Sequence, residues 1–259
     1  MIDVASAVVR AGSSRSDVVR ARGAGPLRLL CPRGAGRAGW IVTSSLGGGL
    51  VDGDEVALAV TIEAGATGVV TTQASTKAYR GRSRQALRVT IEGDGTALVV
   101  PDPVVPYRDA TLVQSTHIAM TAASTLVACD VVTAGRVAHG ERWAAARVDS
   151  TLRIELDGTP RVIDRVVLGE RAGARLGRFE ALATCVLLGP RVREIAAAQL
   201  AALGAVTRGA SLIVSGSAVA GGAMFRIAGA RIDDVIAQTR ALVAPACEAC
   251  GELPWARKW

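Results

Sequence analysis

A dense run of polar side chains, TTQASTKAYR at residues 71–80, interrupts an otherwise apolar sequence. It contains Lys77, which is the only lysine besides Lys258, and Tyr79, one of two tyrosines. Hydroxyl, amide and ammonium groups in this density can bind water, an ion in transit or a partner protein. Nucleophilic catalysis is not indicated, because the chain has no G-x-S-x-G elbow and only two histidines to act as a base.

The spacing of these polar groups predicts how they share the two faces of a strand. Side chains alternate between the faces, so Gln73, Ser75 and Lys77 would lie on one face. Inward-facing polar groups need partners or water. The pattern therefore predicts the lining of a water-filled path or a docking surface, and a solvated edge strand is the alternative. The opposite face would carry Thr72, Ala74 and Thr76.

A glycine-rich stretch precedes this run, with glycines at 47–49 and then Asp52, Gly53 and Asp54. It lacks the Gly-Lys-Ser/Thr ending of a phosphate-binding P-loop. Glycine at these positions permits unusual backbone angles or the close approach of another chain. A tight turn into a strand at 54–62 and a functional loop are equally compatible with the spacing.

A second glycine motif, at Gly34, Gly36 and Gly39, matches the letters of the dinucleotide fingerprint. That motif binds a pyrophosphate only between a strand and the start of a helix. Here Pro32 precedes it and a strand-like run at 40–43 follows it. The context favours a loop, and a nucleotide-dependent oxidoreductase is kept as the alternative hypothesis.

Ligands for a tightly held metal are sparse. Cys247 and Cys250 form one C-x-x-C pair without a second, whereas a structural zinc site takes four ligands; reduced thiols are expected. Carboxylates at 52–54 and 102–109 could offer oxygen ligands to a divalent ion that passes through. Glu141 follows His139 and is expected either as a surface salt bridge or as a functional acid.

Composition limits the function classes. The 259 residues are half hydrophobic, with only four Trp, two Tyr and two Phe, and the net charge is +7. The charge favours an acidic partner weakly, and the scarcity of aromatic residues argues against binding of single-stranded nucleic acid. The N-terminus lacks a secretory signal pattern, and no apolar run approaches the roughly 20 residues that span a membrane. A cytoplasmic protein without a membrane partner is expected.

The elements that position these residues are mainly strands. Apolar and polar residues alternate over 54–62, 87–91, 111–120, 126–132 and 147–156, and the pattern predicts antiparallel strands. Residues 69–72 are expected as the return strand after the turn at Gly65, and Asp157-Gly158 as a hairpin. Helical spacing predicts helices over 190–203 and 231–243, which could pack on the strands or dock a partner. We expect one mainly β domain, 1–259, with two C-terminal helices.

Two motifs in this order resemble the UreD (UreH) family of urease accessory proteins. The family shows GG-x-x-x-GD and then TTQ-A-(A/S)-TK-x-YR, as residues 48–54 and 71–80 do. The proline-rich segment at 101–107, GERW at 140–143 and the tail at 254–259 agree in order. The likeness spans nearly the whole chain.

The resemblance implies a stacked, helical β scaffold and a non-enzymatic nickel-insertion chaperone. Such proteins bind the urease apoprotein, UreF and, through UreF, the GTPase UreG. The family is thought to offer nickel an internal water-filled route, with no tightly bound cofactor; Asp54 and Glu141 are the carboxylates we expect beside it. The residues implied in partner binding or nickel passage are Gly48, Gly49, Gly53, Asp54, Thr72, Gln73, Ser75, Thr76, Lys77, Tyr79, Arg80 and Glu141.

Overall fold

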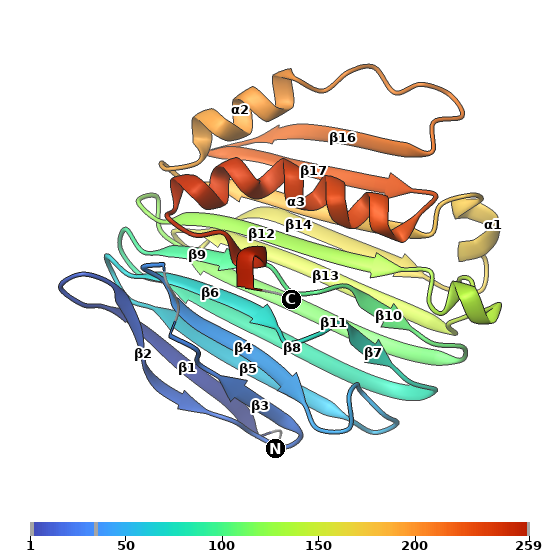
Figure 1. Cartoon of the computed structure of the whole chain (residues 1–259), viewed down its shortest axis with the longest axis horizontal. Coiled ribbons are helices and arrows are strands. Elements are labelled where there is room, and N and C mark those ends of the chain that lie inside the picture. The colour runs from blue at the N-terminus through green and yellow to red at the C-terminus, as the bar shows by residue number, and fades with distance from the viewer. Residues whose placement is uncertain (1–2, 34–35, 258–259) are drawn as a thin grey trace.

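Two β-sheets stacked face to face form the body of the protein (Figure 1). The computed structural model describes residues 3–33 and 36–257. The seven-stranded sheet has the order β14 (Thr159–Leu168), β13 (Arg147–Leu156), β11 (Ala110–Met120), β8 (Gly81–Ile91), β5 (Glu55–Ile62), β1 (Val4–Ala11) and β2 (Ser16–Arg22).

The second sheet is larger and carries the helices. Its main path is β16 (Leu212–Val219), β17 (Gly222–Gly229), β15 (Ala181–Leu188), β12 (Thr125–Thr133), β9 (Thr96–Val99), β6 (Thr67–Thr72), β4 (Gly39–Ser45) and β3 (Leu27–Leu30). The short strands β7 (Thr76–Ala78) and β10 (Val104–Pro106) pair with each other, and β10 pairs with β12. Short 3-10 turns lie at Val137–His139 and Pro254–Arg257.

The central part of the chain coils between the two sheets, and hairpins occur mainly towards its two ends. It passes from β5 to β6, from β8 to β9 and from β11 to β12, changing sheet each time. Successive turns of a coil run in the same direction, so β5, β8, β11 and β13 pair in parallel. The predicted antiparallel pairing of these strands is therefore wrong, and residues 69–72 do not return beside β5 but join the other sheet in β6. The stacked, mainly β architecture is confirmed, as is the hairpin at Asp157-Gly158.

Three α-helices accompany the strands in the described part of the chain, and two of them correspond to predicted ones. α2 (Arg193–Ala201) is shorter than predicted, whereas α3 (Ile232–Ala249) continues beyond Val243 and through Pro245. The last turn of α3 buries Ala246 and Cys247 against the sheet, and such packing outweighs the low helix propensity of proline. The five-residue α1 (Ala172–Leu176) was not predicted.

The core has two main layers. One lies between the sheets and includes Val60, Ile118 and Leu126. The other lies between the ten-stranded sheet and the helices and includes Phe225 and Val243. Because α2 and α3 use their apolar sides in this second layer (Figure 1), packing on the β core accounts for them.

Candidate functional site

The polar segment 71–80 is bent instead of forming one strand. β6 ends at Thr72, residues 73–75 form a bend, and β7 begins at Thr76. Because the alternation is broken at the bend, the predicted common face of Gln73, Ser75 and Lys77 does not exist. Gln73 is exposed and Ser75 and Lys77 are half-buried.

A cavity lies between the two sheets next to this bend. Its volume of about 120 Å³ holds several water molecules, since each needs roughly 10–15 Å³. Thr72 and Thr76 line it, whereas Gln73, Ser75 and Lys77 do not. The segment therefore contributes to a polar internal space through the face opposite to the one we expected. The other polar residues in the lining, some of which contribute only backbone, are Thr43, Thr71, Gln85, Asp102, Gln114, Ser115, Thr116, Asp130, Ser150, Thr151 and Thr184.

Asp130 joins the two walls of the cavity. It lies on β12 in the ten-stranded sheet, and its Oδ2 accepts hydrogen bonds from Nε2 of Gln114 at 2.9 Å and from Oγ of Ser150 at 3.0 Å, both in the facing sheet. Gln114 in turn accepts a hydrogen bond from Gln85 on the next strand. Burial raises the pKa of Asp130 despite these donors. Both donors to this carboxyl are uncharged, and none of the described residues in the lining is a cation. The carboxylate of Asp130 is therefore available to pair with a positively charged ion in the cavity.

The second carboxylate of the lining, Asp102, belongs to the loop after β9. Its backbone N–H donates to Oγ1 of Thr72 at 2.8 Å, and the threonine hydroxyl donates to Oδ2 of Asp102 at 3.2 Å. This reciprocal pair fixes the end of β6 and holds a carboxylate at the cavity wall. Thr72 therefore acts as a positioning residue for Asp102.

The glycine-rich loop packs against the far end of the polar segment. The N–H of Leu50 donates to the carbonyl of Lys77 at 2.8 Å, and the N–H of Tyr79 donates to the carbonyl of Leu50 at 2.9 Å. A Cβ at Gly49 would lie 2.5 Å from the Lys77 carbonyl oxygen and 2.7 Å from the Tyr79 ring. Glycine is therefore required at 49 by close approach, which explains why the two motifs occur together.

Asp54 orders this loop and does not line the cavity. Its Oδ2 accepts the N–H of Val51 at 2.8 Å. Gly48 and Gly53 have φ values of +72° and +84°, in the region that favours glycine. Asp54 is absent from the lining of this cavity, and the geometry supports a role in ordering the loop.

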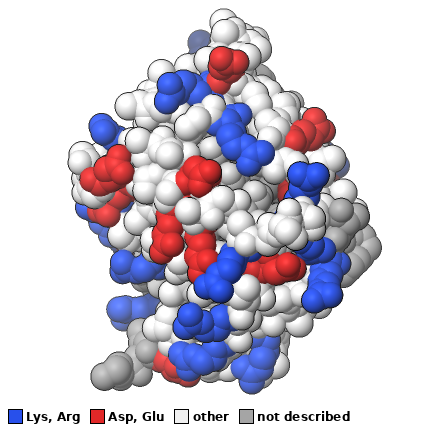
Figure 2. All heavy atoms as spheres, turned by 90° about the vertical axis from the view of Figure 1, so that its left-hand side faces the viewer, with Lys and Arg blue, Asp and Glu red and all other residues white. Residues whose placement is uncertain are grey.

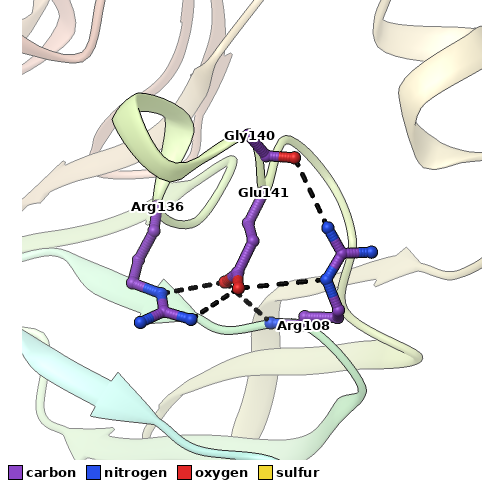
Figure 3. A network of polar contacts seen from close by, with 4 residues as sticks. All are labelled: Arg108, Arg136, Gly140 and Glu141. Carbon is purple, nitrogen blue, oxygen red and sulfur yellow. Dashed lines mark hydrogen bonds and ion pairs between the residues drawn. The ribbon is translucent and has the colours of Figure 1, made fainter.

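Glu141 lies at the same end of the sandwich, in an ion-pair network (Figure 3). Its carboxylate accepts from Nε of Arg136 at 2.9 Å and from the N–H of Arg108 at 3.2 Å. Hydrogen bonds from Arg136 hold the pKa of Glu141 below its usual range. The Arg136 guanidinium lies 4.2 Å from the ring centre of Tyr107.

This network connects to the polar segment through an aromatic pair. Tyr107 meets Tyr79 edge to face, with ring centres 5.0 Å apart. Glu141 does not line the cavity. The structure instead brings Glu141, Tyr79 and Gly49 together into one cluster at the strand ends, with Arg80 exposed next to it.

The remaining predicted motifs do not form sites. Gly34 lies outside the described residues, and Gly39 begins strand β4 instead of a helix, so the dinucleotide hypothesis is not supported. Cys247 and Cys250 are buried, and burial raises their pKa values to about 12 and about 11. Within residues 3–33 and 36–257 no group of three or more metal-ligating side chains comes together.

Sequence reasoning missed the residues that contribute most of the cavity's polarity. Gln85, Gln114 and Ser150 occupy inward positions of their strands, in phase with the buried Val89, Ile118 and Ile154. The sequence does contain a signal for them, since each is a polar residue at a position where the alternation predicts an inward-facing apolar one. None of the described helices is long and apolar enough to cross a membrane.

Comparison with known proteins agrees with these motifs. Residues 4–259 match the family described as UreD urease accessory protein. A urease accessory protein UreD of Sorangium cellulosum is 39% identical over 95% of this chain and 81% of its own length. One from Anaeromyxobacter sp. is 35% identical over 96% of this chain and 90% of its own length. A urease accessory protein D of Arabidopsis thaliana is 35% identical over 66% of this chain and 62% of its own length. The chain therefore belongs to the UreD family of urease accessory proteins.

Proposed function

We propose that this protein is a non-enzymatic maturation factor that binds the urease apoprotein together with UreF and UreG. Nickel is its cargo and not a resident cofactor. The cavity between the sheets is the proposed route, because hydroxyl, amide and carboxyl groups reach it between layers that are otherwise apolar.

The chemistry of the lining supports passage over storage. The lining presents hydroxyl and amide groups and the two carboxylates Asp102 and Asp130, and it contains no histidine among the described residues. Its one cysteine, Cys129, packs its side chain in the layer under the helices. Oxygen donors and water exchange on a divalent cation more readily than a cage of thiolates and imidazoles. Asp130 would compensate the charge of the ion midway between the sheets, and Gln114 would reorient as it passes.

The cluster at the strand ends is the proposed docking surface. It contains the glycine loop, Tyr79, Arg80 and Glu141, and the neighbouring Leu46 and Val51 are 56% and 49% exposed. Exposed apolar side chains beside a rigid polar network suit a protein interface. Gln73 and Lys77, at the bend outside the cavity, would contact the partner at this surface.

The test is co-expression with a urease operon that lacks its own copy of this gene. The wild-type chain should restore urease activity and nickel content. Gln114→Leu, which removes the donor to Asp130, should lower the nickel content of urease while the chain still co-purifies with its partners. Thr61→Val, an outward-facing change in β5, is the matched control.

The readouts separate the two parts of the proposal. No rescue by a soluble wild-type chain that forms complexes would argue against the maturation role. Normal nickel content with Gln114→Leu, at an unchanged melting temperature, would reject the cavity as the route and leave docking in place.

A further inference from the structure

The outer face of the seven-stranded sheet is uncovered. The larger helices α2 and α3 contact the ten-stranded sheet, so the opposite side of the sandwich presents bare strands among the described residues (Figure 1). The outward positions of its central strands carry many arginines. We define the arginine face as Arg82, Arg84, Arg88, Arg147, Arg153 and Arg165 together with Val113, Ile163 and Val167.

The strand register places these residues in two rows. In one row Arg84 lies beside Val113, which lies beside Asp149, which lies beside Val167. Neighbours in a row are about 4.8 Å apart, the spacing of strands in a sheet. Charged and branched apolar side chains therefore alternate along this row.

The second row gathers three basic side chains, two of which share a single carboxylate. Arg88, His117 and Arg153 lie side by side, followed by Ile163. Glu155 contacts both His117, at 3.2 Å, and Arg153. Arg88 has no ion pair within the described chain. The positive charge of Arg88 is therefore not offset by a carboxylate of the described chain.

The arginine face also exposes apolar side chains beside its charged ones. The exposed fractions of Val113, Ile163 and Val167 are 38%, 65% and 45%. Arginine and apolar side chains together, with few lysines, are typical of protein interfaces, and the planar guanidinium pairs with carboxylates through two hydrogen bonds.

The left-hand end of the sandwich in Figure 1 differs from this face. Figure 2 shows this end, where acidic and basic side chains both occur, with carboxylates across the middle. On the arginine face, six arginines meet three outward carboxylates, Glu55, Asp149 and Glu155. The arginine face is therefore net positive by three charges, with His117 taken as neutral.

We infer that the arginine face binds a partner protein whose contacting surface is net acidic and apolar at its centre. A protein fits better than a nucleic acid, because the face has no aromatic side chain among the described residues for stacking on bases. Small outward residues such as Ala57, Ala59 and Ala86 keep the surface flat enough for close contact. The inference rests on the proposed function only in the identity of the partner, which would be the urease apoprotein, UreF or UreG.

The first experiment measures charge recognition on the isolated full chain. Poly-L-glutamate is titrated against the wild type, against Arg82→Glu/Arg88→Glu and against the control Arg171→Glu/Arg208→Glu, which changes the net charge equally at exposed sites elsewhere. Arg82→Glu/Arg88→Glu should bind poly-L-glutamate at least about fivefold more weakly than the wild type does. The control variant should bind it less than about twofold more weakly, because local charge complementarity exceeds the effect of net charge. Equal weakening of both variants would overturn the inference. Tighter binding of duplex DNA than of poly-L-glutamate, lost in the same variant, would also overturn it in favour of a nucleic acid.

The second experiment uses the co-expressed urease proteins. Ile163→Ser/Val167→Ser should reduce co-purification of one of the urease apoprotein, UreF or UreG. Val206→Ser/Leu253→Ser, at side chains that are 57% and 41% exposed elsewhere, should not. Retention of all three partners by the Ile163/Val167 and Arg82/Arg88 variants alike would refute the interface. If the wild type binds none of the three but poly-L-glutamate still selects the arginine face, the proposed function fails and the inference stands.

Discussion

Gln114 and Asp130 belong to different sheets, and the side-chain amide of Gln114 donates to Oδ2 of Asp130 across 2.9 Å. The contact lies in the layer where the sheets otherwise meet through apolar side chains. At this position a hydrogen bond, and not apolar packing, joins the two sheets. An internal polar space needs such a bridge, because unpaired polar groups between apolar sheets would be costly.

Replacing Asp130 should change how stability depends on pH. Burial raises its pKa in the folded state, whereas the unfolded value is about 3.9. At a pH between the unfolded and the folded pKa, the native state holds a proton that the unfolded state has released. The free energy of unfolding therefore falls as pH rises through this window and then levels off. Asp130→Asn removes this loss, and its stability relative to the wild type should therefore improve as pH rises from about 4. Urea unfolding of both proteins between pH 4 and 7 measures the difference; Asp157→Asn in the exposed hairpin turn is the control. Parallel curves for the wild type and Asp130→Asn would contradict the prediction.

The close approach at Gly49 predicts that even a methyl group is not tolerated there. Gly49→Ala would place its Cβ 2.5 Å from the Lys77 carbonyl oxygen, which forces the glycine loop away from the polar segment. We expect a loss of about 1–3 kcal/mol in the free energy of unfolding, typical of overpacking. Gly204→Ala, with no atom within 4 Å of the added Cβ, should change stability by less than about 0.5 kcal/mol. Equal, small effects in denaturant titrations would show that the loop is not held by this contact.

Strand positions could be predicted, but strand partners could not. The alternation in residues 111–120 and 147–156 marks β11 and β13 almost residue for residue. Alternation is the same in parallel and antiparallel strands, so it does not report that β11 and β13 run in the same direction. That depends on the coiled path of the chain between the sheets.

The site was predictable where it depends on local sequence. The glycine loop and the TTQASTKAYR segment do meet, through Gly49 and Tyr79. The cavity was not predictable, because it depends on how two sheets face each other: Gln114 and Asp130 are 16 positions apart and become partners only across that space. The sequence likewise did not show that Thr72 and Thr76, and not Gln73, Ser75 and Lys77, would line the cavity.

Loss of the Glu141 charge should destabilise the protein at neutral pH and not in acid. Arg136 holds the pKa of Glu141 below its usual range, so the contribution to stability is present above the unfolded pKa of about 4.3 and is lost as pH falls through the folded pKa. Glu141→Gln should therefore lower the melting temperature at pH 7, and the difference from the wild type should shrink below pH 4. Glu248→Gln, at an exposed position on α3, should show no such trend. A deficit in Glu141→Gln that is constant with pH would mean that the charge is not what matters.

The five cysteines should divide into one reactive thiol and four protected ones. Cys31 is exposed, whereas Cys129, Cys185, Cys247 and Cys250 are buried. The thiolate is the reactive form, and burial raises the pKa values of Cys247 and Cys250 to about 12 and about 11, so few of these thiols ionise at pH 8.5. A thiol-specific disulfide reagent should therefore label one group rapidly in the native protein and five in denaturant. In Cys31→Ser the rapid phase should vanish while the four slow thiols remain. Rapid labelling of two or more thiols in native Cys31→Ser would show that the layer beneath α3 opens readily, and the packing of α3 on the sheet would then be looser than the buried Ala246 and Cys247 indicate.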